Sequence, residues 1–236
     1  MRKLSISSFS LIGGRDVNED AVREGCRGRR LVGVAADGLG GQGGGDVASR
    51  IAAEEALSAL MDAQRPSADL VRRMMEHANS AVLAEQFSSG CKMMTTLAIA
   101  VVDGRRVLTA HLGDTRVYRF RGDRLIHCSR DHSVTQKLVD GGEITREEMR
   151  THETRNLLLK CLGEMETPDP EIHSGFMWGR ERLLLCTDGF WEKFSDAELA
   201  AAMTADSPQT IMERLKETAL ERADGESDNM TALLIG

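Results

Sequence analysis

The chain has 236 residues, 41% of them hydrophobic, and its 37 acidic and 30 basic residues give a formal net charge of −7. This length and composition allow one large buried core, and the negative charge argues against nucleic acid or an anionic membrane as the main partner. No apolar run approaches the roughly 20 residues of a membrane span, and serines and charges interrupt the first residues, unlike a signal peptide. We therefore expect a cytoplasmic protein without a membrane span.

The cysteines favour the same compartment. They are odd in number and form no CxxC pair, which is unlike a disulfide framework. We expect small core residues in a reducing environment at Cys26, Cys91, Cys128, Cys161 and Cys186.

In the first half of the chain, the apolar pattern predicts strands around a pair of helices. The helices carry apolar residues at three- and four-residue spacing, and we expect them at residues 46–61 and 66–82. The strands are short, and Asp-Gly or Gly-Asp turns join two pairs of them as hairpins. We expect them at residues 4–11, 31–36, 96–102, 106–112, 117–120 and 124–128.

In the second half, short helices alternate with strands. Two of the helices begin with a capping box, Thr145/Glu148 and Ser195/Glu198. The predicted helices lie at residues 133–138, 145–152, 195–203 and 207–223, and the strands at residues 157–162, 171–177, 183–186 and 230–235. With no repeat and no linker-like segment, the pattern indicates one domain of largely antiparallel sheets with paired helices outside.

Three apolar strands meet an aspartate at one end. Asp37 and Asp188 each follow such a strand, and Asp228 lies just before one. A carboxylate at the edge of a hydrophobic strand is costly to desolvate unless something positive meets it. Three of them can share a divalent cation, and oxygen-only ligands favour Mg²⁺ or Mn²⁺ over zinc or copper. The sequence therefore predicts a metal-dependent hydrolase.

Residues 38–43 also match GxGxxG between a strand and a helix, the context of a dinucleotide-binding turn. Two features make this alternative the weaker one. Asp37 would face a pyrophosphate without a cation between them, and the helix is followed by a second helix rather than by a strand with an acidic end. The glycines instead let the backbone pass close to a metal, with the Gly38 carbonyl available as a ligand.

Two further polar segments can have functional roles if they lie beside a metal ion. Taken alone, the loop at residues 15–20 is equally consistent with a functional role and with a solvated loop that holds an ion pair. Asp114 is equally consistent with a functional role and with an ordinary β-turn aspartate. Near a cation, the planar guanidinium of Arg15 can grip two phosphate oxygens. The carboxylates of Glu19 and Asp20 can orient metal-bound water.

Seven short motifs follow one another along the chain. They are Arg15…Glu19-Asp20, residues 37–41, Thr95-Thr96, residues 113–116, residues 131–133, residues 187–191 and residues 227–231. Their order is that of type 2C metal-dependent protein serine/threonine phosphatases, and the chain resembles the compact bacterial members of that family over nearly its whole length.

The resemblance implies an α+β fold and a metal cleft. Two antiparallel sheets would form a central β-sandwich flanked by pairs of α-helices, a four-layer α-β-β-α arrangement. Residues 1–236 would form one catalytic domain, with a flap at about residues 133–160 beside the cleft.

The resemblance also implies a role for each site residue. Asp37 would bridge two Mn²⁺ or Mg²⁺ ions, the Gly38 carbonyl would join one of them, and Asp188 and Asp228 would hold the other. The outer roles are water binding, phosphate binding and ligation of a weaker third metal, and they fall to Glu19 and Asp20, to Arg15, and to Asp114.

The implied activity is hydrolysis of phosphoserine and phosphothreonine in proteins by a hydroxide that bridges the two ions. The substrates would be those of a bacterial serine/threonine kinase, and we expect a monomer. A catalytically silent relative that binds phosphoprotein is the alternative, and a phosphatase of small phosphoesters is a weaker competitor. Intact Arg15, Asp37, Asp188 and Asp228 favour the enzyme.

Three positions depart from the family pattern. Leu39 replaces the histidine that many animal and plant members carry and that is proposed as the general acid. Met94 replaces a glycine, and Glu192 replaces an aspartate of the third-metal site, which leaves occupancy of that site open. No histidine is an obvious substitute for the general acid. His132 lies within the motif at residues 131–133, and we expect it to be structural.

Overall fold

The computed structural model describes residues 4–40, 43–204, 207–223, 225 and 227–236. Gly41 and Gln42 of the glycine-rich motif lie outside the described residues. The strands are β1 (Ile6–Leu11), β2 (Ala21–Arg27), β3 (Arg30–Ala36), β4 (Gly38–Leu39), β5 (Met94–Thr95), β6 (Leu97–Asp103), β7 (Arg106–Leu112), β8 (Arg116–Arg121), β9 (Arg124–Cys128), β10 (Glu171–Phe176), β11 (Glu181–Cys186) and β12 (Met230–Ile235). The helices are α1 (Gly45–Asp62), α2 (Ala68–Ser89), α3 (Val134–Asp140), η1 (Glu148–Thr151), α4 (Asp188–Trp191), α5 (Asp196–Ala202) and α6 (Pro208–Arg222).

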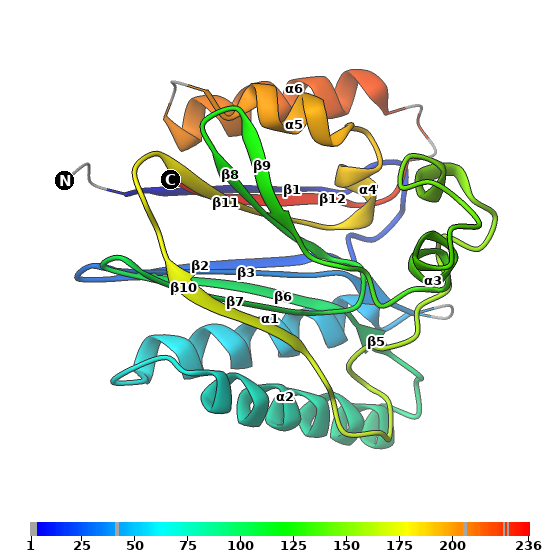
Figure 1. Ribbon diagram of the computed structural model, residues 1–236. Helices are drawn as coiled ribbons and strands as arrows, with labels where there is room; N and C mark the ends of the chain where they lie inside the picture. Colours follow the sequence, from blue (N-terminus) through cyan, green and yellow to red (C-terminus); the bar gives the residue numbers. More distant parts are fainter. Residues whose placement is uncertain (1–3, 41–42, 205–206, 224, 226) are drawn as a thin grey trace.

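Two five-stranded antiparallel sheets form the centre of the molecule. Their strand orders are β1-β12-β11-β8-β9 and β10-β7-β6-β3-β2. Figure 1 shows the sheets face to face, with α5 and α6 over the first and α1 and α2 over the second. The predicted four-layer sandwich is confirmed. None of the described helices is long and apolar enough to cross a membrane.

Strand β3 contacts two apolar cores, which explains its unbroken hydrophobic sequence. Val32 and Val34 pack in the cluster formed with α1 and α2, whereas Leu31 belongs to the cluster between the sheets. All seven residues of β3 are buried, as expected for a strand covered on both faces. A Cβ at Gly33 would lie 2.4 Å from Cδ2 of Leu233, so a larger residue at this position would require the Leu233 side chain of β12 to move.

The flap forms fewer regular elements than the sequence predicts. Residues 157–162 are not a strand, because only isolated bridges join Leu158 and Leu162 to other segments. The predicted helix at residues 145–152 shortens to the 3-10 turn η1, although Thr145 and Glu148 do exchange the predicted capping bonds.

Two other expectations need correction. Strand β2 is absent from the prediction because it lies at a sheet edge and carries charged, partly exposed residues that break the apolar pattern. The five cysteines are free thiols, and Cys161 and Cys186 are buried as expected. Cys26 and Cys91 are exposed, so their assignment to the core is wrong.

Candidate metal centre

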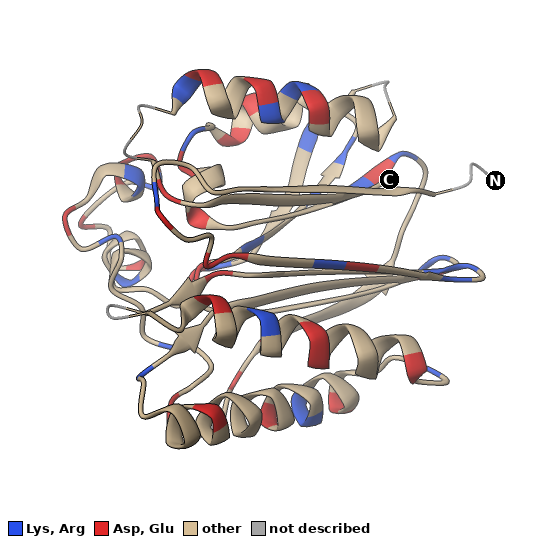
Figure 2. Cartoon of the chain, turned by 180° about the vertical axis from the view of Figure 1, so that it is seen from behind, with Lys and Arg blue, Asp and Glu red and all other residues tan. Residues whose placement is uncertain are grey.

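The three strand-end aspartates come together at one end of the sandwich and form an acidic cluster. Asp37 follows β3 in one sheet, while Asp188 follows β11 and Asp228 precedes β12 in the other. Strands β11 and β12 are hydrogen-bonded neighbours. Figure 1 places this end beside the flap and away from the two chain termini, and Figure 2 shows acidic segments meeting there from both sheets.

The backbone at Asp37 is fixed by two threonines of the segment that leads into β6. The Asp37 amide donates to Oγ1 of Thr96 over 2.9 Å, and Oγ1 of Thr95 donates to the Asp37 carbonyl over 2.8 Å. A Cβ at Gly38 would lie 2.2 Å from the Gly45 carbonyl oxygen and 2.5 Å from that of Glu19. Only glycine fits where these three backbone segments meet.

Asp228 is paired with Arg15 from the N-terminal loop. One Asp228 oxygen, Oδ2, accepts a hydrogen bond from Nη2 of Arg15 over 2.8 Å, and the other accepts one from the Asn229 amide over 2.8 Å. The side chains of Arg15 and Asp228 are 57% and 43% exposed. The guanidinium therefore lies beside the cluster and is open to solvent, where a phosphate group can reach it.

Asn229 and Thr187 attach the loop that carries Glu19 and Asp20. Oδ1 of Asn229 accepts from the Glu19 amide over 2.8 Å, and its Nδ2 donates to the Ile12 carbonyl over 2.7 Å. Oγ1 of Thr187 donates to Oδ2 of Asp20 over 2.8 Å. The sequence pattern places these residues in motifs but does not reveal that their side chains hold the N-terminal loop on the cluster.

The carboxylates repel one another in a buried setting. Burial raises the pKa of Asp37 well above its ordinary value, and the negative charges of Asp188, Asp20 and Asp114 raise it further. The pKa of Asp188 is raised by burial and by Asp228, and the pKa of Asp20 is raised by burial to about 7. Such an all-oxygen set with excess negative charge fits Mg²⁺ or Mn²⁺, since a divalent cation would offset the repulsion.

These raised pKa values predict that the metal-free protein loses stability as pH rises. The folded state holds protons on carboxyl groups whose unfolded pKa is about 4. Their contribution is fully present below that value and is lost as pH rises through the folded pKa, which is about 7 for Asp20. In chelator, we expect the melting temperature to fall by several degrees from about pH 5 to about pH 8.

Thermal unfolding over this pH range checks the prediction, with saturating Mn²⁺ as the control. The cation should abolish the fall, and Asp20→Asn should reduce it in chelator. A melting temperature that is independent of pH in chelator would contradict the charge repulsion described here.

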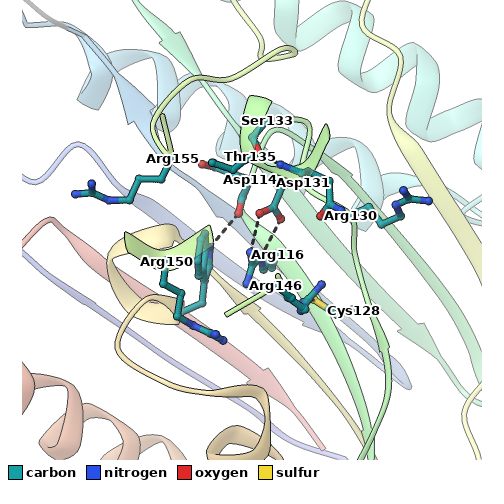
Figure 3. Close-up of polar contacts among 12 residues, drawn as sticks. Asp114, Arg116, Cys128, Arg130, Asp131, Ser133, Thr135, Arg146, Arg150 and Arg155 are labelled. Atoms are coloured by element: carbon teal, nitrogen blue, oxygen red, sulfur yellow. Dashed lines mark hydrogen bonds and ion pairs between the residues drawn. The ribbon is translucent and has the colours of Figure 1, made fainter. Parts of the chain in front are cut away.

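Asp114 lies next to a buried ion pair, which Figure 3 shows. The two side chains of that pair, Arg116 and Asp131, are 1% and 2% exposed. Arg116 donates to both Asp131 oxygens over 2.9 and 2.7 Å, and its guanidinium lies 3.4 Å from the centre of the Trp191 ring. Burial and the charge of Asp188 raise the pKa of Asp114, while Arg116 opposes the rise. Asp114 is thus a buried carboxylate on the side of the cluster nearest the flap.

Three of the flap arginines are only partly exposed, because they pair with acidic residues below the flap. Arg146 and Arg150 contact the Asp196 carboxylate, which begins α5, at 2.9 and 3.3 Å. Arg155 contacts Glu192 at 3.2 Å. Burial and the charge of Asp188 raise the pKa of Glu192 to about 7. The flap is therefore paired with a carboxylate, Glu192, whose pKa is raised by a member of the acidic cluster.

The two other positions that depart from the family pattern, and His132, make structural contacts. Leu39 and Met94 pair opposite each other in the short β4–β5 ladder. Nδ1 of His132 accepts from the Gly113 amide over 3.1 Å, and its ring stacks on that of His111. Burial and His111 lower the pKa of His132 to about 4, so it is neutral near pH 7, and these contacts support the structural role expected for it.

Comparison with known proteins agrees with this arrangement. Residues 10–223 match the family described as Protein phosphatase 2C. The chain belongs to this family. It is 33% identical over 222 residues to the serine/threonine protein phosphatase PstP of Mycobacterium tuberculosis, a match that covers 92% of this chain and 41% of PstP. The chain thus spans about two fifths of the mycobacterial relatives. It is also 28% identical over 215 residues to the protein phosphatase PhpP of Streptococcus pneumoniae, with 88% of this chain and 86% of PhpP covered.

Solved structures share the fold. The crystal structure of the M. tuberculosis phosphatase PstP/Ppp superposes with a TM-score of 0.88 at 31% identity, covering 98% of this chain and 97% of that one. The catalytic domain of PstP in complex with two manganese ions superposes with a TM-score of 0.85 at 29% identity and the same coverage. The resemblance to type 2C phosphatases drawn from the motifs is confirmed.

Proposed function

We propose that this chain is a protein serine/threonine phosphatase that depends on two Mn²⁺ or Mg²⁺ ions. The observation that carries the proposal is the group of partly buried, mutually repelling aspartates at the ends of strands from both sheets, with Arg15 at its edge. Relatives of similar sequence are named serine/threonine phosphatases, and a solved relative is described with two manganese ions. Family membership and the local charge therefore agree.

The proposed ligands are those that the resemblance to the family implies. Asp37, which directly follows β3, would bridge the ions, with the carbonyl of Gly38 joining one of them. Asp188 and Asp228 would hold the other ion. Asp114 would contribute to a third, weaker site, and Glu19 and Asp20 would hold water around the ions.

The reaction needs an attacking hydroxide, a group that holds the phosphoryl group, and a proton for the leaving oxygen. Cations of this kind, when bound, would lower the pKa of water and so supply the attacking hydroxide. The guanidinium of Arg15 orients the phosphoryl group and takes up its developing charge. To do so it exchanges its contact with Asp228 for phosphate oxygens. Leu39 has no titratable proton to donate, so water protonates the leaving serine or threonine oxygen.

The wider assignments are proposals on the same basis. Residues 1–236 would form one catalytic domain that acts as a monomer in the cytoplasm. Its partners would be phosphoserine and phosphothreonine proteins made by a bacterial serine/threonine kinase.

Phosphate release from a phosphothreonine peptide tests the proposed function. After complete chelation, we expect no turnover, and we expect turnover to return with Mn²⁺ or Mg²⁺. A phosphotyrosine peptide and a small aryl phosphate serve as comparison substrates. A folded protein that is inactive at every metal concentration would support the silent, phosphoprotein-binding alternative. Activity on the small aryl phosphate alone would instead support a phosphatase of small phosphoesters.

The flap is proposed to select the protein substrate. Its arginines Arg146 and Arg150 are held by Asp196, so the segment is a defined surface beside the cleft. Replacing residues 133–160 by the flap of a relative is expected to change the ratio of rates on two phosphoprotein substrates by about tenfold, which corresponds to about 1.4 kcal/mol. Hydrolysis of a small aryl phosphate is the control and should stay nearly constant. Equal losses on all substrates would instead place the flap in the chemistry or the fold.

A further inference from the structure

Four of the six histidines of the chain gather at one edge of the sandwich, apart from the acidic cluster. His111 belongs to β7, His127 to β9 and His173 to β10, and His132 follows β9. Glu171 of β10 lies among them and pairs directly with His111 in the β10–β7 ladder. Because β9 and β10 are edge strands of different sheets, this group spans the gap between the two sheets.

One subset offers three ligand atoms to a common point. His127, Glu171 and His173 each provide one such atom, and all of these atoms lie within 4.8 Å of one another. Nε2 of His173 lies 2.6 Å from Oε1 of Glu171, and the rings of His127 and His173 meet edge to face with centroids 4.5 Å apart. Both histidines line a cavity of about 210 Å³, so an ion and its water have room.

The neighbouring subset of His111, His132 and Glu171 also lies within 4.8 Å, but its hydrogen bonds oppose metal binding. Nδ1 of His132 accepts from the Gly113 amide, so the proton of the neutral ring is on Nε2 and blocks that atom as a ligand. The His111 and His132 rings stack at an interplanar angle of 5° and do not converge. The first subset is therefore the better site.

We propose that His127, His173 and Glu171 bind a divalent cation of the zinc class and thereby tie β9 to β10 across the open edge of the sandwich. Two imidazoles and a carboxylate, with water completing a tetrahedron, form a ligand set typical of Zn²⁺ and unlike that of Mg²⁺. The bound ion displaces the proton that His173 shares with Glu171. The side chains of His173 and Glu171 are 49% and 30% exposed, so they are free to close on the ion.

The charged groups around the site do not prevent this. Arg119 lies opposite His127 in the β8–β9 ladder, but its guanidinium is engaged by Glu181 and by the Phe176 carbonyl. Burial and His173 lower the pKa of His127, which keeps its imidazole in the neutral form that binds metals. The ring nitrogens of His127 make no hydrogen bond within the described part of the chain, so this ligand is available.

Equilibrium dialysis of the untagged protein against Zn²⁺ tests the proposal, with excess Mg²⁺ present to occupy oxygen ligands. We expect one bound Zn²⁺ per chain. His127→Gln and His173→Gln should each weaken binding by more than about tenfold, a loss that even outer-shell changes cause. His77→Gln is the matched control, because His77 contacts Glu55 at 3.1 Å and, among the described residues, belongs to no candidate metal group.

Two further readouts separate specific ligation from loose association. Co²⁺ in the site should give the visible absorption of a four-coordinate ion, and this absorption should be lost in His173→Gln. Zn²⁺ should raise the melting temperature of the wild type and of His77→Gln but not of His127→Gln. Phosphatase turnover with Mn²⁺ should be unchanged in His127→Gln, so the result does not depend on the proposed function. The proposal is overturned if the wild type binds no Zn²⁺ in excess Mg²⁺, or if the His127→Gln/His173→Gln double variant binds it equally tightly.

Discussion

Asp37→Asn is expected to lower kcat/KM for a phosphothreonine peptide in Mn²⁺ by about 10³-fold or more, roughly 4 kcal/mol of transition-state stabilisation. Asparagine keeps the size of the side chain and one oxygen, but it removes the charge that two cations would share. Since Asp37 joins the two halves of the proposed centre, both ions should bind more weakly. Metal titrations of activity measure the loss.

The same substitution is expected to stabilise the metal-free protein, and this opposite sign is the informative part. Burial and neighbouring carboxylates raise the pKa of Asp37, so its ionised form is disfavoured in the fold. Neutral asparagine removes that repulsion, and the melting temperature in chelator should rise by a few degrees at neutral pH. Asp169→Asn is the control, because that side chain is 84% exposed and pairs with Lys160. A variant that is both inactive and less stable in chelator would indicate damage to the fold rather than loss of a ligand.

Arg15→Ala is expected to lower kcat/KM for the same peptide by about 10²-fold, and Arg15→Lys should recover only part of the loss. A guanidinium can bind two phosphoryl oxygens in one plane, which an ammonium group cannot do. Removing one donor to a developing anion costs roughly 10²–10³-fold in comparable sites. Steady-state kinetics over a range of peptide concentrations measure the effect.

Metal affinity separates this role of Arg15 from a structural one. Nη2 of Arg15 donates a hydrogen bond to Oδ2 of Asp228 over 2.8 Å. Removing the guanidinium frees that oxygen, so Arg15→Ala should bind Mn²⁺ as tightly as the wild type or more tightly. Affinity for Mn²⁺ that falls tenfold in Arg15→Ala would show that the arginine supports the ligands instead of the phosphate.

Much of the fold could be predicted from the sequence because local pattern and tertiary environment agree. The periodicity of α1 and α2 and the Asp-Gly turn between β6 and β7 are each specified within a few residues. The Ser195/Glu198 capping box of α5 forms as predicted. Strand β2 could not be predicted, because an edge strand with charged residues lacks a local apolar signal. Residues 157–162 are apolar without forming a strand, since neighbours in space, and not their own pattern, decide their pairing.

The candidate site could be predicted in its composition but not in its supports. An aspartate at the end of an apolar strand is visible locally, and this singled out Asp37, Asp188 and Asp228. The bonds from Thr187 to Asp20 and from Asn229 to Glu19 join residues 167 and 210 positions apart. No local pattern encodes such distant contacts. The pairing of Arg155 with Glu192 was likewise hidden, because it depends on how the flap lies on α4.

Anomalous diffraction from crystals grown with Mn²⁺ is the most direct test of the central claim, that strand-end aspartates from both sheets bind a pair of divalent cations. We predict two peaks roughly 3.5–4 Å apart, with Asp37 in contact with both and with Asp188 and Asp228 in contact with one. No Mn²⁺ among these three aspartates, under conditions in which the chain hydrolyses a phosphothreonine peptide, would contradict the account.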